Sequence, residues 1–273
     1  KLELERDRFS ALLAPAEASE VQMAVLESLS KQKSPEVASL VLSAWSQFTP
    51  ELRRRAVELF AQRESWLHEL FASIELGDVR VADIDPTYWA TWKNHPSQTI
   101  RERVAKLRAN AVSSDRQAVF NDYKEVLQKP GDATRGQKVF TKNCATCHKL
   151  GGEGHELGPN LAAMANRGAE SILYNILAPN AEVESRYVNY AITDLDGIVR
   201  TGVISSETAS SITLRGANND THTILRVDID DGGVQSTGVS LMPEGLEQQI
   251  DKAAMADLLA YLREVTSKQG EGK

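Results

Sequence analysis

Two cysteines and a histidine stand together near the middle of the chain, and these side chains are the ones best suited to chemistry. Cys144 and Cys147 are the two cysteines of the sequence, and His148 follows at once. A Cys-x-x-Cys pair can form half of a zinc site, act as a redox dithiol or, when His comes next, attach haem covalently. The segment therefore indicates metal binding, thiol chemistry or haem attachment.

The rest of the sequence separates these three hypotheses. A structural zinc site needs four ligands. The additional candidates in the half of the chain that holds the cysteines are His148, His155 and His222, and there is no second Cys pair. A redox dithiol usually opens a helix beside a β-α-β pattern, and no such pattern precedes the pair. Two thioethers at this spacing would fix the porphyrin edge and leave the next residue under the iron. We therefore expect one covalent haem c, with Cys144 and Cys147 as anchors and His148 on the iron.

Four further motifs accompany the pair. Gly136 and Phe140 precede it, and a Gly-Pro-Asn-Leu segment at residues 158–161 follows. A Ser-Leu-Met-Pro segment lies at residues 240–243, and the segment Met-Ala-Asp-Leu-Leu-Ala-Tyr-Leu lies near the end of the chain, at residues 255–262. In type, order and spacing these motifs resemble those of class I cytochromes c.

This resemblance implies roles for single residues. In that family a proline carbonyl, here that of Pro159, accepts the free N–H of the proximal histidine, which sets its tautomer and ligand strength. Met242 would be the second axial ligand of the iron, and Gly136 would allow a close approach of two helices at Tyr261. The walls of the haem pocket would be Phe140, Leu161 and Tyr261.

Met242 has two competitors for the iron. Met164 is closer in sequence to His148 but lies in an Ala-rich segment, where a methionine is by default a core residue. His155 lies in the Gly-rich loop after the pair and would give bis-His ligation or remain exposed. We predict Met242, because imidazole and thioether are a standard haem pair that raises the reduction potential. Ligands on both axial positions would disfavour oxygen or peroxide chemistry.

The elements that must position these residues are interrupted by a different structure. Met242 comes 94 residues after His148, whereas in small cytochromes c the methionine loop follows soon after the middle helices. From residue 187 the apolar period changes to two, and Asp196-Gly197 is a hairpin signal. We expect a small antiparallel β-meander or barrel that ends in the polar, Gly-rich stretch 230–238.

The chain before residue 129 has a helical pattern. Apolar residues recur at three- and four-residue spacing, and helix starts are marked by Ser34-Pro35, Thr49-Pro50 and His95-Pro96. Similar segments at 50–57 and 96–105 suggest degenerate HEAT-like repeats, with a plain bundle as the alternative. We interpret Arg53 to Arg55 as a solvated helix face. The four tryptophans are expected in the core.

The predicted fold is therefore mostly α with a β insertion. Residues 1–128 form a HEAT-like helical domain, and residues 183–238 form the inserted β subdomain. Residues 131–182 and 239–267 together form a cytochrome c helical fold.

Composition limits the partners. The chain carries a net charge of −7, and residues 131–273 hold 19 acidic but 13 basic side chains, which argues against nucleic acid because that partner needs basic patches. No apolar run reaches the ~20 residues of a membrane span. The charged start has no initiator Met and no signal-peptide pattern, so we interpret the chain as a fragment of a larger protein. Asp residues around the predicted strand turns at 194–196 and 228–231 are interpreted as turn residues rather than calcium ligands.

A second resemblance concerns the larger protein. Residues 240–246 and the interrupted layout are similar to the C-terminal haem-binding domain of multidomain proteins from planctomycetes and verrucomicrobia, described as membrane-bound or secreted dehydrogenases. The resemblance implies a one-electron-transfer module rather than an enzyme, in a periplasmic or otherwise extracytoplasmic place. Its partner would be an electron donor or acceptor protein or an upstream dehydrogenase domain, and an oligomer is possible. The alternatives are a haem enzyme or a gas or redox sensor with an open or His155-ligated distal site, and a scaffold with structural haem.

Overall fold

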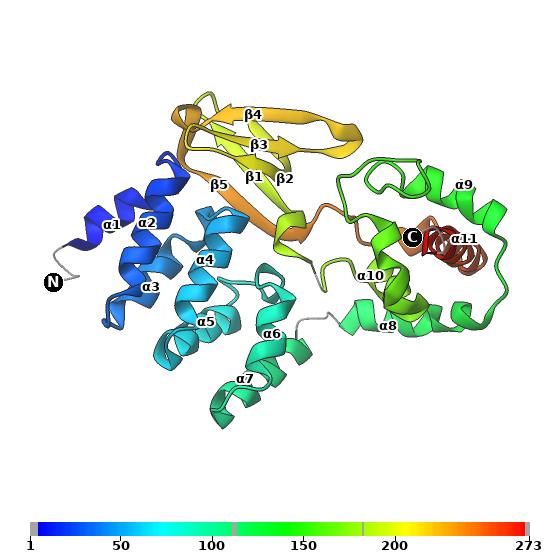
Figure 1. Ribbon diagram of the computed structural model, residues 1–273, viewed down its shortest axis with the longest axis horizontal. Coiled ribbons are helices and arrows are strands. Elements are labelled where there is room, and N and C mark those ends of the chain that lie inside the picture. Colours follow the sequence, from blue (N-terminus) through cyan, green and yellow to red (C-terminus); the bar gives the residue numbers. More distant parts are fainter. Residues whose placement is uncertain (1–4, 111–113, 182, 271–273) are drawn as a thin grey trace. The chain divides into compact units, whose positions relative to one another are not determined.

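The computed structural model describes residues 5–110, 114–181 and 183–270 (Figure 1). It is mostly helical, with one five-stranded sheet. The described residues form two compact units, which we call the first unit (residues 5–110, 183–215 and 221–239) and the second unit (residues 114–181, 216–220 and 240–270). No helix in the described part of the chain has the length and apolar character needed to cross a membrane.

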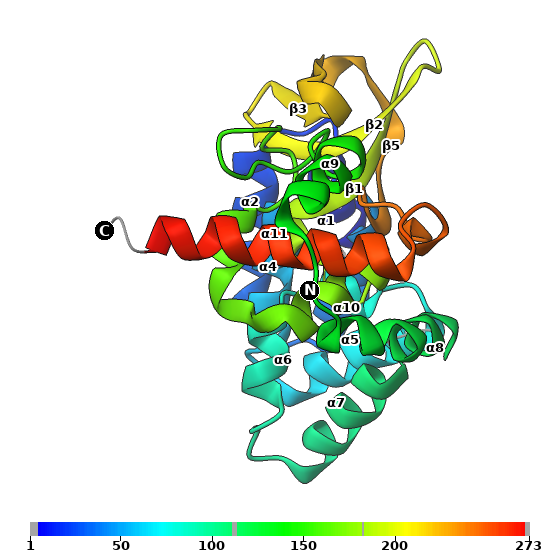
Figure 2. The same ribbon diagram turned by 90° about the vertical axis from the view of Figure 1, so that its right-hand side faces the viewer.

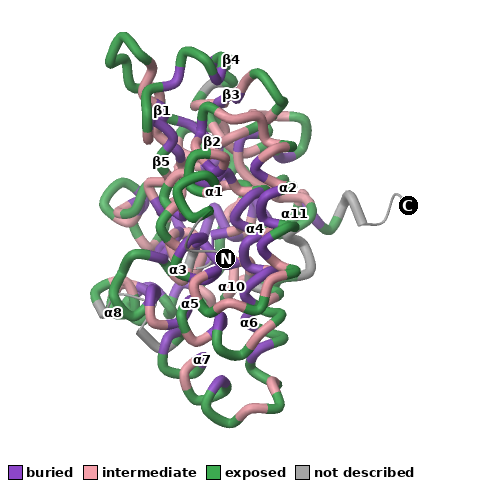
Figure 3. The backbone as a smooth tube through the Cα atoms, turned by 90° about the vertical axis from the view of Figure 1, so that its left-hand side faces the viewer, coloured by how far each residue is buried: buried purple, intermediate pink, exposed green. Residues whose placement is uncertain are grey.

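The first unit begins with a row of short helices. They are α1 (Arg6–Leu12), α2 (Ser19–Ser30), α3 (Glu36–Ser43), α4 (Pro50–Phe60), α5 (Glu64–Leu76), α6 (Pro86–Trp92) and α7 (Gln98–Asn110), with 3-10 turns η2 (Trp45–Gln47) and η3 (Val81–Asp83). Proline opens α4 and α6, where its missing N–H costs nothing. Buried positions recur along α2 and α4 and show the periodic apolar face predicted from the sequence (Figure 3). All four tryptophans are at most 3% exposed, as predicted.

A five-stranded sheet completes the first unit. Its strands are β1 (Val188–Asp194), β2 (Val199–Glu207), β3 (Ser211–Arg215), β4 (Thr221–Leu225) and β5 (Ile229–Ser240), in the spatial order β4-β3-β2-β1-β5. Strands β1 to β4 form the predicted antiparallel meander. The predicted end of the sheet at residues 230–238 is wrong, because this stretch lies within β5, which crosses back to the edge at β1. A Cβ at Gly233 would lie 2.5 Å from the Thr193 carbonyl oxygen, so this strand needs glycine to approach its neighbour.

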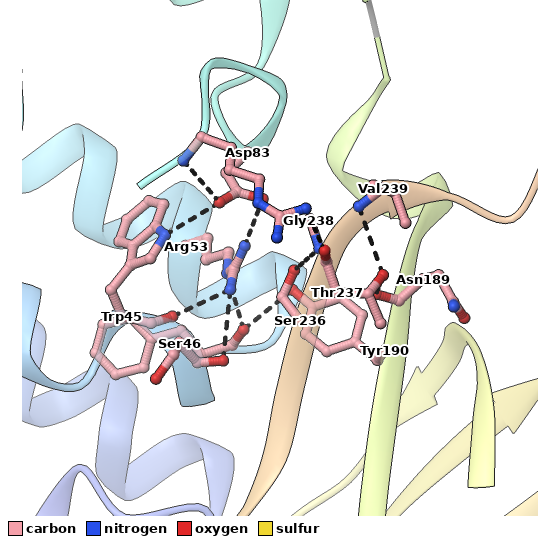
Figure 4. Close-up of polar contacts among 12 residues, drawn as sticks. Trp45, Ser46, Arg53, Asp83, Asn189, Tyr190, Ser236, Thr237, Gly238 and Val239 are labelled. Atoms are coloured by element: carbon pink, nitrogen blue, oxygen red, sulfur yellow. Dashed lines mark hydrogen bonds and ion pairs between the residues drawn. The ribbon is translucent and has the colours of Figure 1, made fainter. Parts of the chain in front are cut away.

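A buried ion pair in the helical part of the first unit lies beside Tyr190 of the sheet (Figure 4). Arg53 of α4 lies 2.7 Å from Asp83 of η3, and the two side chains are 3% and 4% exposed. The Arg53 guanidinium also lies over the rings of Trp45 and of Tyr190 in β1. The Tyr190 hydroxyl donates to the Phe48 carbonyl at 3.0 Å. The prediction of a solvated arginine face is therefore wrong for Arg53, because aromatic rings and a carboxylate replace its water.

The second unit is helical. It contains α8 (Ser114–Tyr123), α9 (Ala133–Asn143), α10 (Gly168–Leu177) and α11 (Lys252–Gly270), with 3-10 turns η4 (Lys124–Gln128), η5 (Leu161–Arg167) and η9 (Leu246–Gln248). Phe120, Tyr123 and Val126 pack into the same core cluster as Phe140. The helical segment 114–128, which the sequence pattern grouped with residues 1–110, therefore contributes to the core of the second unit. The three-part division of the chain stays a prediction.

Helices α9 and α11 cross at close range (Figure 2). A Cβ at Gly136 would lie 2.0 Å from the Asp257 carbonyl oxygen and 2.8 Å from Tyr261 Cβ. Glycine is therefore required at this crossing, and the predicted close approach of Gly136 to Tyr261 is confirmed. Across the same crossing Arg135 donates to both carboxylate oxygens of Asp257, at 2.6 and 2.8 Å.

Candidate functional site

The Cys pair lies in a tight turn at the end of α9. The Cys144 amide donates to the Phe140 carbonyl at 2.8 Å, and the amides of Cys147 and His148 both donate to the Cys144 carbonyl, at 3.0 and 2.9 Å. Phe140 is fully buried in the core of the second unit. Helix α9 thus ends at a buried aromatic residue, and backbone hydrogen bonds place Cys144, Cys147 and His148 in one tight turn.

Both cysteines are free thiols in an apolar setting. Burial raises the pKa of Cys144 to about 12, and the neighbouring Cys147 adds to the shift. Burial also raises the pKa of Cys147. Reactive dithiols and thiolate metal ligands need the opposite shift, so this environment favours neutral sulfur. Thioether sulfur, which carries no charge, fits it.

The loop after His148 folds back under the turn. The amides of Leu157 and Gly158 donate to the Cys147 carbonyl at 3.1 and 2.7 Å, and His148 Nδ1 lies 3.0 Å from the Pro159 carbonyl oxygen. A Cβ at Gly158 would lie 2.5 Å from His148 Cε1, so glycine lets the loop pass against the ring. The contact of His148 with Pro159 is the one that the resemblance to class I cytochromes c implies.

This hydrogen bond sets the chemistry of the imidazole. A carbonyl oxygen can only accept, so Nδ1 carries the proton and Nε2 keeps its lone pair. Burial lowers the pKa of His148, and the Pro159 carbonyl acts in the opposite direction. The net shift favours the neutral ring, which is the form that binds a metal through Nε2.

The loop around Met242 enters from β5 and is held by three hydrogen bonds. The Met242 amide donates to Ser240 Oγ at 3.0 Å, and the Ser240 amide donates to Asn180 Oδ1 at 2.8 Å. Asn180 Nδ2 in turn donates to Glu244 Oε1 at 2.8 Å. Met242 itself is partly buried and packs against the core of the second unit.

The predicted wall residues lie in this same core. Phe140 and Tyr261 are buried, with ring centroids 5.7 Å apart, and burial raises the pKa of Tyr261. Leu161, at the start of η5, is partly buried against the same cluster as Met242 and Cys144. Asn160 caps η5 by accepting from the Ala162 amide at 2.9 Å. The second unit therefore gathers all eight predicted site residues in one unit of the fold.

The competing ligands have different surroundings. The His155 amide donates to the Ala145 carbonyl at 3.1 Å, which holds this residue beside the turn that carries Cys144 and Cys147. The side chain of Met164 lies outside the described residues. Within the described ranges, His, Cys, Asp and Glu do not gather in any group of three or more that could hold a metal ion.

Two site residues were missed from the sequence. Gly158 was noted only as part of a motif, although its lack of a side chain makes room for the His148 ring. Asn180 follows Ala178-Pro179, where it reads as a helix-stop residue. Its contact with Ser240 spans 60 positions, and no local pattern signals it.

Comparisons with known proteins agree with this geometry. The family model "Cytochrome c" matches residues 133–191. The chain is 31% identical over 86 residues to a cytochrome c-553-like protein of Synechocystis sp., covering 27% of this chain and 81% of that protein.

Plant proteins match over a shorter range. The chain is 47% identical over 45 residues to a cytochrome c of Stellaria longipes and 46% identical over 39 residues to one of Cannabis sativa. These matches cover 16% and 14% of this chain, and the chain spans only 42% and 35% of the two plant proteins. The Synechocystis relative, in contrast, is covered over most of its length. The chain therefore belongs to the cytochrome c family, whose domains bind haem covalently and transfer electrons.

Proposed function

We propose that the second unit is a one-electron carrier whose haem c is attached through Cys144 and Cys147 and ligated by His148 and Met242. The hydrogen bond of His148 Nδ1 to the Pro159 carbonyl carries this proposal. It occurs directly after a Cys-x-x-Cys turn, and it leaves Nε2 as the ring atom able to bind iron. The bound haem would supply reversible one-electron chemistry, and the chain's own residues would hold, orient and shield it.

The surroundings of the cysteines support their role as anchors. Their thiols are partly buried and their pKa values are raised, which suits permanently neutral thioethers. The backbone of the turn fixes their spacing through the Cys144 carbonyl. Gly158 and Pro159 then press the loop against His148, so that the imidazole cannot rotate away from its carbonyl partner.

The choice of Met242 as the second ligand rests on packing and on the position of its competitor. Met242 and Cys144 both pack against the core cluster that contains Phe140. The backbone of His155 is held beside the turn that carries Cys144 and Cys147, on the segment that already supplies His148. A ligand for the opposite axial position is better supplied by a different segment, and the loop 240–244 is such a segment.

A histidine–methionine pair has two consequences. It raises the reduction potential relative to two histidines. With both side chains held on the iron, the centre would exchange electrons without binding oxygen or peroxide. We therefore propose a carrier rather than an enzyme.

The setting of the whole protein is also a proposal. Covalent attachment of haem takes place outside the cytoplasm, which favours a periplasmic or other extracytoplasmic place. The interrupted layout favours an electron-transfer part of a larger dehydrogenase, with the helical segment as a HEAT-like spacer or docking platform. Its partner would then be an upstream dehydrogenase domain or a separate redox protein.

Absorption spectra of the haem-loaded chain test the ligation. The reduced protein should keep its spectrum under carbon monoxide for seconds to minutes, and the oxidised protein should show the long-wavelength sulfur-to-iron band. Met242→Ala should lose that band and bind carbon monoxide at once. His155→Ala is the matched control and should behave like the unaltered chain.

Three results would contradict the proposal. Immediate carbon monoxide binding by the unaltered chain would indicate a sensor or enzyme with an open site. Loss of the native spectrum in His155→Ala, but not in Met242→Ala, would indicate bis-His ligation. A redox titration without a reversible one-electron wave would favour a structural haem.

A further inference from the structure

Asn180 lies where the chain leaves the second unit, and its side chain contacts the segment that returns. The chain passes into the first unit after residue 181 and, apart from residues 216–220, stays there until it comes back at Ser240. Asn180 Oδ1 accepts the Ser240 amide at 2.8 Å, and Asn180 Nδ2 donates to Glu244 Oε1 at 2.8 Å. One amide side chain thus contacts the Met242 loop on both sides of the methionine.

The far side of this loop is held independently. Leu246 and Ile250 are buried in the core, and the Tyr123 hydroxyl oxygen lies 3.1 Å from the carbonyl oxygens of both Glu247 and Ile250, which share its one proton. Arg116 pairs with Glu247 at 3.0 Å. The near side, between Ser240 and Met242, continues directly from strand β5 of the other unit. It therefore needs an anchor of its own within the second unit.

Two hydrogen bonds in series connect the Asn180 side chain to the Met242 backbone through Ser240. Asn180 fixes the Ser240 backbone, and Ser240 Oγ accepts the Met242 amide at 3.0 Å. A local side-chain-to-backbone bond of this kind fixes a turn. The partly buried Asn180 can satisfy both its oxygen and its nitrogen in this arrangement, and an apolar residue there would satisfy neither.

We propose that Asn180 is a positioning residue for Met242, holding the methionine loop closed across the root of the β insertion. This inference rests on the proposed role of Met242 as an axial ligand. Asn180 does not touch the iron in this proposal. Asn180 instead lowers the fraction of time in which the loop, and with it the Met242 sulfur, lies away from the iron.

Four variants of the haem-loaded chain test this role. Asn180→Ala removes both contacts, and Asn180→Asp keeps an acceptor for the Ser240 amide but faces the Glu244 carboxylate. Asn180→Asp with Glu244→Gln restores both contacts, because the new amide at position 244 donates to the new carboxylate at position 180. Asp251→Ala is the matched control, since it removes a different acceptor, 2.8 Å from the Ala254 amide, in the same unit.

The readouts report on the thioether rather than on stability alone. They are the rate at which the reduced protein binds carbon monoxide, the sulfur-to-iron band and hydrogen exchange at the Ser240 amide. We expect Asn180→Ala to bind carbon monoxide about tenfold faster, as follows from the loss of one or two hydrogen bonds. Its band should weaken and its Ser240 amide should exchange faster. Asn180→Asp/Glu244→Gln should return toward the native values, and Asp251→Ala should not differ from them.

The outcomes separate this inference from the proposed ligation. A native protein without the sulfur-to-iron band would overturn the ligation and the inference together. A native protein with the band, and an Asn180→Ala variant that binds carbon monoxide no faster than Asp251→Ala, would overturn the inference alone. If Asn180→Ala does not take up haem, Asn180→Asp with and without Glu244→Gln gives the same comparison, and absence of rescue by the second change would overturn it.

Discussion

The two units differ in how they surround their most important side chains. In the first unit the aromatic and charged residues around Arg53 are almost fully buried by other protein atoms. In the second unit the side chains of the Cys pair, His148, Leu161 and Met242 are only partly buried. The central side chains of the first unit are therefore covered by the protein itself. Those of the second unit leave room for a large apolar group to bind beside its core.

Each unit also contains an Arg–Asp ion pair, and the two pairs differ in how far they are buried. Arg53 and Asp83 are 3% and 4% exposed, and they join two helical segments, α4 and η3. Arg135 is 64% exposed and Asp257 9% exposed, and they clamp a helix crossing that glycine already brings together. A pair deep in the core costs much when it is broken, whereas a half-exposed pair adds little because water screens it.

The largest expected effect comes from removing the anchors of the haem. Cys144→Ala/Cys147→Ala should abolish covalent haem, which haem staining of a denaturing gel would show. Hydrogen exchange should then reveal loss of protection in α9 and α11, while α2 to α5 remain protected. The reason is that the hydrophobic clusters of the two units share no residue.

Tryptophan fluorescence supplies the control for this experiment. All four tryptophans lie between residues 45 and 92, so their emission reports on the first unit. Its unfolding free energy should stay within about 0.5 kcal/mol of the native value. A much larger loss would mean that the two units unfold as one cooperative body.

The second effect concerns two neighbouring arginines. Arg53→Met leaves the Asp83 carboxylate buried without its partner and should destabilise the first unit by about 3–5 kcal/mol. Arg54→Met breaks exposed pairs with Glu51 and Glu58 and should cost less than about 1 kcal/mol. Urea unfolding followed by tryptophan fluorescence measures both. Equal effects of the two substitutions would contradict the core role of Arg53.

A double variant sharpens this result. Arg53→Met/Asp83→Leu replaces both charges by apolar groups and should recover most of the lost stability, because no buried charge is left unpaired. Failure to recover would mean that Arg53 acts through its contacts with the Phe48 and Trp45 carbonyls rather than through Asp83.

The sequence predicts those features whose signals are local. The Cys-x-x-Cys-His spacing and the following Gly-Pro segment both lie within short windows. Thr49-Pro50, one of the predicted helix starts, marks the start of α4. The Asp196-Gly197 signal falls between β1 and β2.

The features that were missed depend on distant partners. Arg53 is buried because Asp83 and Tyr190 lie around it, and Tyr190 is 137 positions away. Residues 230–238 are polar and rich in glycine, yet they form a strand because β1 offers a free edge, and such pairing overrides weak strand propensity. The contact of Asn180 with Ser240 exists only because the insertion returns beside its own starting point.

The smallest expected effect is an acid sensitivity confined to the second unit. The Arg135 guanidinium holds the pKa of Asp257 below its ordinary value of 3.8; burial opposes this shift and the Asp132 amide adds to it. A carboxylate with a lowered pKa stabilises the folded state above the ordinary value, and this contribution is lost as the pH falls through the folded pKa. The stability of the second unit, followed by haem absorbance in urea, should therefore decrease below about pH 4.

Asp257→Asn should be less stable at neutral pH, and its unfolding free energy should depend less on pH in the acid range. Asp122→Asn is the control, because Asp122 is an exposed carboxylate that pairs with Lys252; its stability should change with pH as in the native chain. An unchanged pH dependence in Asp257→Asn would show that the α9–α11 crossing depends on its glycine contact and not on this ion pair.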